Sequence, residues 1–566
     1  MHDLVIRGGT LIDGKGNDRV ECDVAVDAGV VSAVGRVGER GREEIDARDR
    51  LVLPGWVDAH THYDGQATWD ADMTPSIWHG VTSLVMGNCG VGFAPARPEQ
   101  HQWLIELMEG VEDIPGAALA EGVRYTWESF PEYLDTLEAM PRTLNVAAQM
   151  PHHALRVYVM GERAARHEPA SAEDLEQMAS LTEQAVRAGA LGFTTSRTYV
   201  HRTSTGEPVP ASDAAPSELL AIAAGLGRAG RGAFGLISDF EDESADMAWM
   251  RDIVRQSGRP LWFLLVRWDH EGDKWRRMLD RVSDARGDGI DIRAQVASRP
   301  IGALMGLGCS LHPFITHKTY RELRSLPVAE RAARMRDPAL RAAMLAEQVN
   351  PRSPLMQTVT RDFHKLYPMS EPMDYEPTFE QSVAGIAARQ GVEPAALAYD
   401  LLSEGDGSRI CFFPLVNYGD GDNETLREMM QHPGTLLGLG DGGAHCGTIC
   451  DASMPTTLLT HWGRDRTRGE RLPLEWLVKR QTWDNARYFG LHDRGRVEVG
   501  ARADLNVIDF DALQVALPCM VHDLPAGGRR LIQRARGYEA TIVNGEVVLR
   551  CDELTGLRPG RLLRGG

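Results

Sequence analysis

The two ends of the chain share a sequence pattern typical of β-strands, and this feature constrains the fold most. Short runs of Val, Ile and Leu separated by Gly and Asp turns fill residues 1–54, as in "HDLVIRGGTLIDG". The same pattern returns in "YEATIVNGEVVLRCDE", where Asn-Gly between two apolar runs predicts a hairpin. Each piece is too small to bury a core alone. We therefore expect residues 1–54 and 487–566 to pair into one β-sandwich, with a larger domain inserted between them.

The middle of the chain alternates helix and strand patterns, as parallel α/β architecture requires. The segment "EDLEQMASLTEQAVRAG" has helical apolar spacing behind Ser171, a plausible N-cap, and leads through Gly189 into the strand-like "ALGFTTS". The chain has 566 residues, more than one compact domain, although an α/β barrel can take about 250 residues or more. We expect residues 55–486 to form the α/β domain, with an elaborated insertion at about 311–390.

The amino-acid composition and charge exclude some classes of binding partner. The formal net charge is −19 and the pI about 5.4, whereas a nucleic-acid partner needs a basic face. No apolar run approaches the length of a membrane span, and the N-terminus begins with a strand pattern in place of a signal peptide. The eight cysteines show no CxxC spacing and read as reduced thiols. We expect a cytoplasmic protein, and a homo-oligomer formed through exposed sheet edges or barrel helices would be unsurprising.

Two histidines, His60 and His62, follow an apolar run and a Pro-Gly turn in "LVLPGWVDAHTHYDG". In a strand, residues i and i+2 point to the same face. The two imidazoles would project together and could bind Zn²⁺ or a similar ion. Two ordinary polar residues at a strand end are the alternative, but the flanking Asp58 and Asp64 favour a metal site.

Two more strand ends carry candidate groups. An apolar strand ends at Asp441 in "LGLGDGGAHCG", where a carboxylate could ligate a metal or transfer a proton. A turn aspartate is the alternative. Cys89 follows another apolar strand in "VMGNCGVGFAP", and it is either a ligand in a tight loop or a buried small hydrophobe.

Together these segments resemble a known family. The N-terminal β segment, "LPGWVDAHTHYDG", "GVTSLVMGNCGVGFAP", the strand before "GDGGAH" and "ADLNVIDFD" resemble the amidohydrolase superfamily, and within it the N-acyl-D-amino-acid deacylase (D-aminoacylase) group. The resemblance covers nearly the whole chain. It implies an α/β fold with a TIM-like (β/α)8 barrel, a flanking β-sandwich domain built from both termini, and hydrolysis of an amide bond at a metal site.

The resemblance also implies roles for single residues. It implies His60 and His62 as ligands of one metal position and Cys89 as the family's thiolate ligand. Asp441 is implied as the catalytic acid/base that can also touch the metal.

The chain departs from the group where two further histidine ligands are expected. Asp239, in "LISDFEDES", stands at the first position and could supply an oxygen ligand, whereas Leu265, in "FLLVRWDHEG", stands at the second and cannot ligate. Exchanging imidazole for carboxylate hardens the site and shifts its preference from Zn²⁺ towards Mn²⁺ or Fe²⁺. We expect one divalent ion, with Zn²⁺ as the first choice.

Five side chains are candidates for binding the substrate. His152 and Arg156 match a "GHxxLR" pattern of the group, and Arg267 stands where the group has a lysine. Arg197 and His201 belong to a polar segment after a strand pattern. An arginine can hold a substrate carboxylate with two parallel hydrogen bonds. A structural ion pair or a solvated loop is the alternative for these residues.

The favoured function is hydrolysis of the C–N amide bond of an N-acyl amino acid or a related amide. A bound divalent ion would polarise the carbonyl and activate water, while Asp441 moves the proton to the leaving nitrogen. The expected partner is a small-molecule substrate with a carboxylate. One alternative is a metal-dependent enzyme that acts on a cyclic amide or a natural product. Another is a catalytically silent amidohydrolase-like binding protein.

Overall fold

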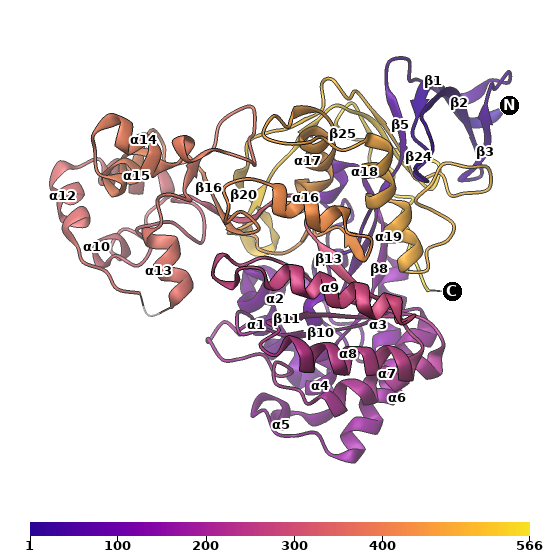
Figure 1. Ribbon diagram of the computed structural model, residues 1–566, viewed down its shortest axis with the longest axis horizontal. Helices are drawn as coiled ribbons and strands as arrows, with labels where there is room; N and C mark the ends of the chain where they lie inside the picture. Colours follow the sequence, from indigo (N-terminus) through magenta and orange to yellow (C-terminus); the bar gives the residue numbers. More distant parts are fainter. Residues whose placement is uncertain (352, 566) are drawn as a thin grey trace.

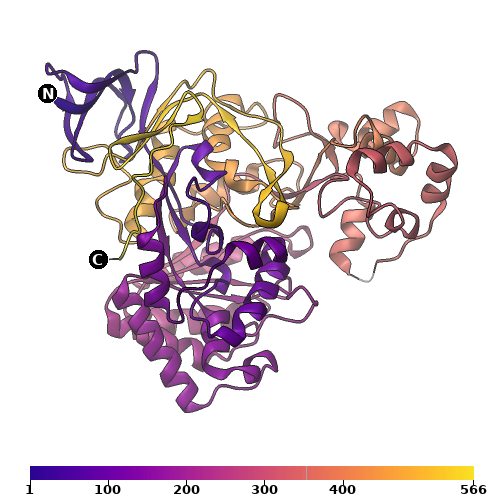
Figure 2. The same cartoon turned by 180° about the vertical axis from the view of Figure 1, so that it is seen from behind.

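The structure, a computed structural model, describes residues 1–351 and 353–565. Figure 1 shows a central α/β unit, a β-sheet beside the N-terminus, and a helical lobe that projects from the opposite side. Figure 2 shows the same three parts from behind, with the yellow C-terminal segment running between the sheet and the central unit. The observed fold is therefore α/β, as predicted.

Strands from both ends of the chain form one nine-stranded sheet. Its order is β25-β24-β23-β18-β5-β1-β2-β3, with β4 also paired to β1. The antiparallel pair β5–β18 joins the two ends of the chain. The strands are β1 (His2–Leu11), β2 (Val20–Asp27), β3 (Val30–Gly35), β4 (Gly41–Asp46), β5 (Leu51–Pro54), β18 (Leu505–Ile508), β23 (Tyr538–Val543), β24 (Glu546–Arg550) and β25 (Glu553–Leu554).

This sheet encloses a core of its own. Val24 of β2 and Ile542 of β23 belong to the same buried cluster, although three strands separate theirs in the sheet order. The sheet must therefore curl around that core. The predicted Asn-Gly hairpin joins β23 to β24, and Asn544 and Gly545 both have positive φ (48° and 86°), as a tight two-residue hairpin turn requires.

The central unit contains parallel strands in two sheets. One sheet has the order β6-β7-β8, and the other has the order β17-β13-β12-β11-β10-β9. Only Gln149 separates β8 from β9, so the two sheets continue one into the other. The strands are β6 (Trp56–Asp58), β7 (Val81–Met86), β8 (Asn145–Ala148), β9 (Met150–Pro151), β10 (Gly192–Arg197), β11 (Ala233–Ser238), β12 (Leu261–Leu264), β13 (Ile292–Val296) and β17 (Thr435–Leu437).

Helices connect and cover these strands (Figure 1). The predicted helix behind Ser171 is α6, where Ser171 and Asp174 form a capping box and Gly189 ends the helix. The helices are α1 (His101–Glu112), α2 (Gly116–Gly122), α3 (Phe130–Ala139), α4 (His152–Met160), α5 (Glu162–Ala165), α6 (Ala172–Ala188), α7 (Pro216–Ala229), α8 (Glu243–Ser257), α9 (Lys274–Gly287), α16 (Glu424–Gln431), α17 (Met454–Thr457), α18 (Leu474–Gln481) and α19 (Trp483–Tyr488).

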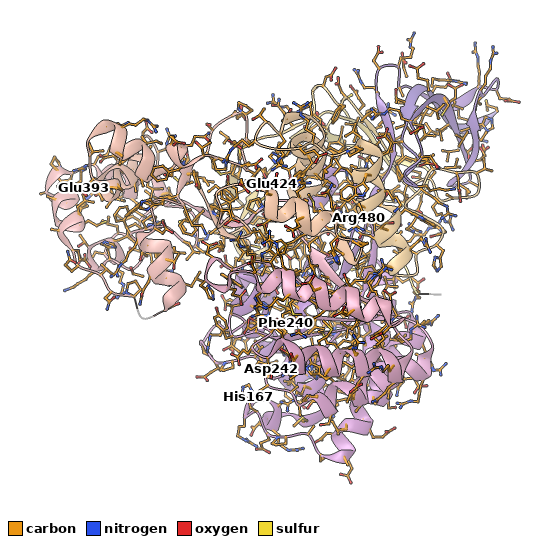
Figure 3. All side chains as sticks on the ribbon, viewed as in Figure 1. His167, Phe240, Asp242, Glu393, Glu424 and Arg480 are labelled. Atoms are coloured by element: carbon orange, nitrogen blue, oxygen red, sulfur yellow. The ribbon has the colours of Figure 1, made fainter. Side chains whose placement is uncertain are left out.

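Side chains of α18 and α19 hold β17 and β6 close to each other. Arg480, labelled in Figure 3, donates to the backbone oxygen (2.8 Å) and Oγ1 (2.9 Å) of Thr435. Asn485 Nδ2 donates to Val57 O of β6 (3.0 Å) and to Leu437 O of β17 (2.6 Å). The residues that follow these two strands therefore emerge side by side.

The helical lobe lies between β13 and β17 in the chain. Two of its buried residues, Tyr320 and Tyr399, belong to a core cluster separate from that of the central unit. Its elements are β14 (Ile301–Met305), α10 (Lys318–Arg321), α11 (Val328–Met335), α12 (Pro338–Ala346), α13 (Pro354–Arg361), β15 (Tyr367–Pro368), α14 (Val383–Gln390), α15 (Pro394–Ser403) and β16 (Cys411–Val416).

Four short strands lie between β18 and β23 in the chain. They are β19 (Gln514–Val515), β20 (Cys519–Leu524), β21 (Gly528–Ile532) and β22 (Ala535–Arg536), which pair as β19–β22 and β20–β21. In the part of the chain that the structure describes, every helix is too short or too polar to cross a lipid bilayer.

Candidate metal centre

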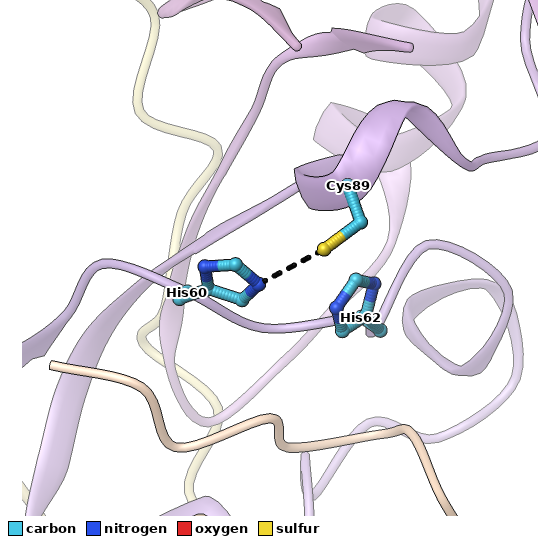
Figure 4. A group of neighbouring side chains, drawn as sticks. All are labelled: His60, His62 and Cys89. Atoms are coloured by element: carbon cyan, nitrogen blue, oxygen red, sulfur yellow. Dashed lines mark hydrogen bonds between the residues drawn. The ribbon is translucent and has the colours of Figure 1, made fainter. Parts of the chain in front are cut away.

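His60, His62 and Cys89 form a compact group of ligand atoms (Figure 4). One ligand atom from each residue lies within 4.8 Å of the other two, and all three residues are buried. The distance from His60 Nε2 to Cys89 Sγ is 3.4 Å. The histidines follow β6 with one residue between them, so the strand-like spacing brings both rings to one side. The structure brings together the three residues that local sequence patterns suggested separately.

The backbone after β7 places Cys89 in this group. Cys89 lies in a short 3-10 turn and has φ 54°, next to Gly87 with φ 80°. A side chain at Gly87 would meet the Gln149 backbone oxygen at 2.3 Å, so only glycine fits this turn. Asn88 donates to the backbone oxygens of Thr61 (3.1 Å) and Val85 (2.9 Å), which ties the turn to the His60–His62 segment.

Asp441 reaches the same group from the segment after β17. Its Oδ1 lies 3.6 Å from Nε2 of His60 and 3.6 Å from Nε2 of His62. Its backbone N–H donates to His60 O (3.0 Å), and its φ is 45°. Burial opposes ionisation of Asp441, but the hydrogen bond from His62 and the charges of His60 and His445 lower its pKa to about 2. The carboxylate is therefore ionised and can accept a proton.

Two buried side chains that the sequence analysis did not single out contact the outer nitrogens of the histidines. Gln295 Oε1 lies 2.7 Å from His60 Nδ1. Glu112 Oε1 lies 3.4 Å from His62 Nδ1, and Glu112 Oε2 lies 3.6 Å from His445 Nε2. A glutamine inside the apolar strand "DIRAQVA" was a usable signal for Gln295. Glu112 gave none, because a glutamate at a helix end is ordinarily solvated.

Burial shapes the protonation of the ligand side chains. It lowers the pKa of His60 to about 4 and raises the pKa of the Cys89 thiol to about 11. Burial alone would also lower the pKa of His62, but the charge of Glu112 and the hydrogen bonds that His62 donates to Asp441 and Cys89 raise it well above its usual range. His60 therefore presents a free lone pair, whereas Cys89 needs a cation to become a thiolate.

Two of the predicted substrate contacts, His152 and Arg156, are part of a buried polar network. Both bind Glu218 Oε1 at 2.9 Å, His152 through Nε2 and Arg156 through Nε. His152 Nδ1 also lies 2.8 Å from Thr195 Oγ1, and Arg156 donates to backbone oxygens, including that of Pro210 (2.8 Å). These contacts hold α4 and α7 together and leave neither side chain directed at the metal group.

Arg197 and His201 lie on the segment after β10. Arg197 donates to Ala214 O and stacks over the Trp249 ring at 5.7 Å. His201 Nδ1 lies 2.8 Å from Ser196 Oγ. Burial and the charges of the neighbouring histidines, His445 first, lower the pKa of His201 to about 3. His201 therefore lies within the electrostatic reach of the metal group.

Asp239 and Arg267 have other partners than those predicted. Asp239 accepts hydrogen bonds from Thr198 Oγ1 (2.5 Å) and Tyr199 N (2.8 Å) and is not part of the ligand group. Arg267 forms a two-pronged ion pair with Asp420, with one N–H···O distance of 2.8 Å. We therefore remove Asp239 from the candidate ligand set, because its carboxylate is already held by the segment after β10.

Leu265 stands where the second histidine was expected and is a core residue. It is 3% exposed and belongs to the main buried cluster of the central unit. Its backbone N–H donates to Gln295 O (2.9 Å). Leu265 therefore contributes to packing and cannot bind a metal ion.

The chain is similar to known proteins in sequence and in fold. Two relatives from Alcaligenes xylosoxydans xylosoxydans align over nearly the whole chain. A D-aminoacylase is 26% identical over 99% of this chain and 97% of its own, and an N-acyl-D-aspartate deacylase is 28% identical over 100% and 95%. A solved N-acyl-D-glutamate deacylase from Bordetella bronchiseptica, complexed with zinc and a phosphonate inhibitor, matches with a TM-score of 0.64 and 23% identity over 100% of this chain and 99% of its own.

A family model described as "Amidohydrolase family" matches residues 43–549. The match covers most of the chain, including the segments that carry His60, His62, Cys89 and Asp441. It confirms both the predicted family and the predicted enzyme class, a hydrolase of C–N bonds other than peptide bonds. The chain belongs to the amidohydrolase family and is similar to its N-acyl-D-amino-acid deacylases.

Proposed function

We propose that this protein is a metal-dependent hydrolase that cleaves the amide bond of an N-acyl amino acid. The observation that carries the proposal is the buried group of His60, His62 and Cys89 with the Asp441 carboxylate 3.6 Å from both imidazoles. Relatives named D-aminoacylase and N-acyl-D-aspartate deacylase support an N-acyl-D-amino acid as the substrate class.

The parallel strands support a closed TIM-like barrel as the scaffold. We propose that β8 and β9 act as one strand and that β17 closes against β6, where Asn485 bridges both. Residues 55–486 would then be the barrel domain, residues 1–54 with 487–566 the β-domain, and 311–390 an insertion in the barrel. The active site would lie at the carboxyl ends of the strands, as in other barrel enzymes.

The donor set fits one divalent metal ion. Two imidazoles and a thiol are the ligands that Zn²⁺ prefers, and three protein ligands leave a position open for catalysis. Both oxygens of Glu112 and Nδ1 of His62 are buried without a hydrogen-bond partner among the described residues, as expected beside a site that gains a positive charge. Without Asp239 the set is softer than we expected from the sequence, which favours Zn²⁺ over Mn²⁺ or Fe²⁺.

Asp441 is the proposed acid/base. A metal ion bound here would polarise the amide carbonyl and lower the pKa of a water molecule. The ionised carboxylate of Asp441, at the centre of the group, accepts the proton of the attacking water and returns it to the leaving nitrogen. Its low pKa keeps the carboxylate ionised across neutral pH. His60 and His62 flank the carboxylate and fix its position.

Arg197 and His201 are the proposed contacts for the substrate carboxylate. Residues on either side of His201, including Arg197, Tyr199 and Arg202, line a hollow of about 460 Å³. The hollow also holds four carboxylates, those of Asp239, Glu241, Asp242 and Asp246, so its overall charge does not favour an anion. The proposed role rests instead on a two-pronged ion pair between Arg197 and the substrate carboxylate. Arg156 and Arg267 are less suited to this role, because each already has a carboxylate partner.

The test is metal analysis of the purified protein together with a hydrolysis screen on paired N-acyl-D- and N-acyl-L-amino acids. We expect about one zinc per chain and turnover of the D-substrates that is lost on chelation and restored by Zn²⁺. A protein that binds no metal on reconstitution and hydrolyses no N-acyl amino acid would refute the proposal. Metal-dependent turnover of cyclic amides alone would favour the alternative enzyme.

A further inference from the structure

Glu112, the last residue of α1, is a buried carboxylate beside the metal centre. It is 1% exposed, and both of its oxygens lack a hydrogen-bond partner among the described residues. The nitrogens beside it are His62 Nδ1 at 3.4 Å and His445 Nε2 at 3.6 Å. Burying a carboxylate that accepts no hydrogen bond costs free energy of folding, on the order of several kcal/mol. A residue kept there at that cost has a role that involves these rings.

We infer that Glu112 is a positioning residue that acts through His62 to hold the metal ligand set, an inference that rests on the proposed function. A neutral imidazole carries one N–H. His62 Nε2 faces Asp441 and the ligand group, while His62 Nδ1 faces Glu112. A carboxylate beside Nδ1 favours a proton on that nitrogen, so the proton released when a metal ion binds is the one on Nε2, and the Nε2 lone pair becomes the ligand.

His60 has a matching but uncharged partner. Its Nδ1 lies 2.7 Å from Gln295 Oε1, and its Nε2 faces Cys89 and Asp441. Both ligand histidines are therefore oriented from behind, one by an amide and one by a carboxylate. A carboxylate makes the imidazole it contacts a stronger ligand than an amide does.

The end of α1 also holds the segment that carries Asp441. The backbone oxygen of Glu112 accepts from His445 N. The next residue, Asp113, accepts from Gly447 N (3.1 Å) and Thr448 Oγ1 (2.5 Å). These contacts involve the backbone of Glu112 and the side chain of its neighbour, so a substitution of the Glu112 side chain leaves them in place. The role of the carboxylate can thus be tested separately from the role of the helix end.

The test uses Co²⁺ as the probe in the full-length metal-free protein. Glu112→Gln keeps the size and an acceptor oxygen but removes the charge, and Glu112→Ala removes both. Glu109→Gln on the same helix is the matched control, because Glu109 is exposed and its carboxylate accepts a hydrogen bond from Gly116 N (3.0 Å), which the amide oxygen of glutamine can also accept. Affinity is measured by competition with a chelator, and the thiolate-to-cobalt absorption band reports whether Cys89 and the histidines bind together.

We expect the dissociation constant for Co²⁺ to rise by about 10- to 100-fold in Glu112→Gln, more in Glu112→Ala, and not at all in Glu109→Gln. Wild-type affinity and an unchanged absorption band in Glu112→Gln would overturn the inference and leave the proposed function standing. If the wild type itself binds no Co²⁺, the proposed function fails and the inference fails with it.

Near-ultraviolet circular dichroism checks that each variant is folded before titration. If Glu112→Gln does not fold, Glu112→Asp replaces it, because its carboxylate keeps the charge but ends one methylene short of His62. A rise of at least several-fold in its dissociation constant is expected. An unchanged value would overturn the inference.

Discussion

The strand ends of β6 and β7 differ from those of β11 and β12, although the family resemblance implies metal ligands at both. After β6 and β7 the side chains of His60, His62 and Cys89 point at one another and have buried partners behind them. After β11 and β12, Asp239 is held by neighbouring backbone and hydroxyl groups, and Leu265 is packed in the core.

The difference concentrates the candidate metal site on one side of the parallel strands. The ligands at β6 and β7 are close in sequence to their strands, so local backbone geometry places them. Their orientation depends on Gln295, Glu112 and Asp441, which come from distant segments. After β11 and β12, Asp239 and Leu265 make structural contacts, which stabilise the segments around the site.

The largest expected effect is loss of the metal in His60→Ala/His62→Ala. Removing two of three ligands leaves Cys89 alone, so we expect no stoichiometric zinc and a fall in kcat/KM on the order of 10³-fold or more. Zinc content and single-substrate kinetics measure the effect. The matched control is His270→Ala, which removes an exposed histidine beyond β12. If His270→Ala lost zinc and the double variant kept it, the metal ligands would lie beyond β12 and not after β6.

Asp441→Asn should separate chemistry from metal binding. The amide keeps the size of the side chain but cannot accept the water proton, so we expect kcat to fall by about 10²- to 10⁴-fold. Zinc content should stay near that of the wild type, because the three ligands remain. Kinetics and metal analysis on the same preparation check both parts. An active Asp441→Asn enzyme would contradict the assigned acid/base.

Glu218→Gln should reduce stability more than metal binding. Glu218 pairs with Arg156 and His152 in the core, and leaving a buried charge without its partner costs about 3–5 kcal/mol. Burial would raise the pKa of Glu218, but hydrogen bonds from His152 and the charge of Arg156 lower it. Its stabilising contribution is therefore present above the ordinary carboxyl pKa and is lost as the pH falls below it.

Urea denaturation of Glu218→Gln and wild type at several pH values measures this effect. The difference in unfolding free energy should shrink as the solution is acidified. Equal zinc content in both proteins would show that the Glu218 network does not contribute to metal binding. Zinc loss with an unchanged free energy of unfolding would contradict the prediction and show that it does.

The smallest expected effect is that of Arg267→Ala. Arg267 pairs with Asp420, whose side chain is 55% exposed, and solvent-exposed ion pairs contribute at most about 1 kcal/mol. We expect a small loss of stability and an unchanged KM, measured by denaturation and steady-state kinetics. A large rise in KM would show that Arg267 binds the substrate and that the β12 side takes part in the site after all.

Much of the fold followed from local sequence patterns. The Asn-Gly hairpin and the helix behind Ser171 depend on short-range periodicity and turn chemistry, which neighbouring residues determine. The substrate contacts were harder to predict. An arginine after a strand has the same local pattern whether it faces a ligand or, like Arg156, a buried glutamate 62 residues further along the chain.

The sequence by itself determined that His60 and His62 share a face, because side chains two residues apart in an extended strand point the same way. It also determined that Cys89 sits in a tight turn, since Gly87 allows the backbone to adopt a positive φ. Only the tertiary structure decided that these turns meet, that Asp441 lies between the imidazoles, and that Glu112 is buried behind His62. Those contacts join segments up to about 380 residues apart, and no local interaction determines how such segments pack.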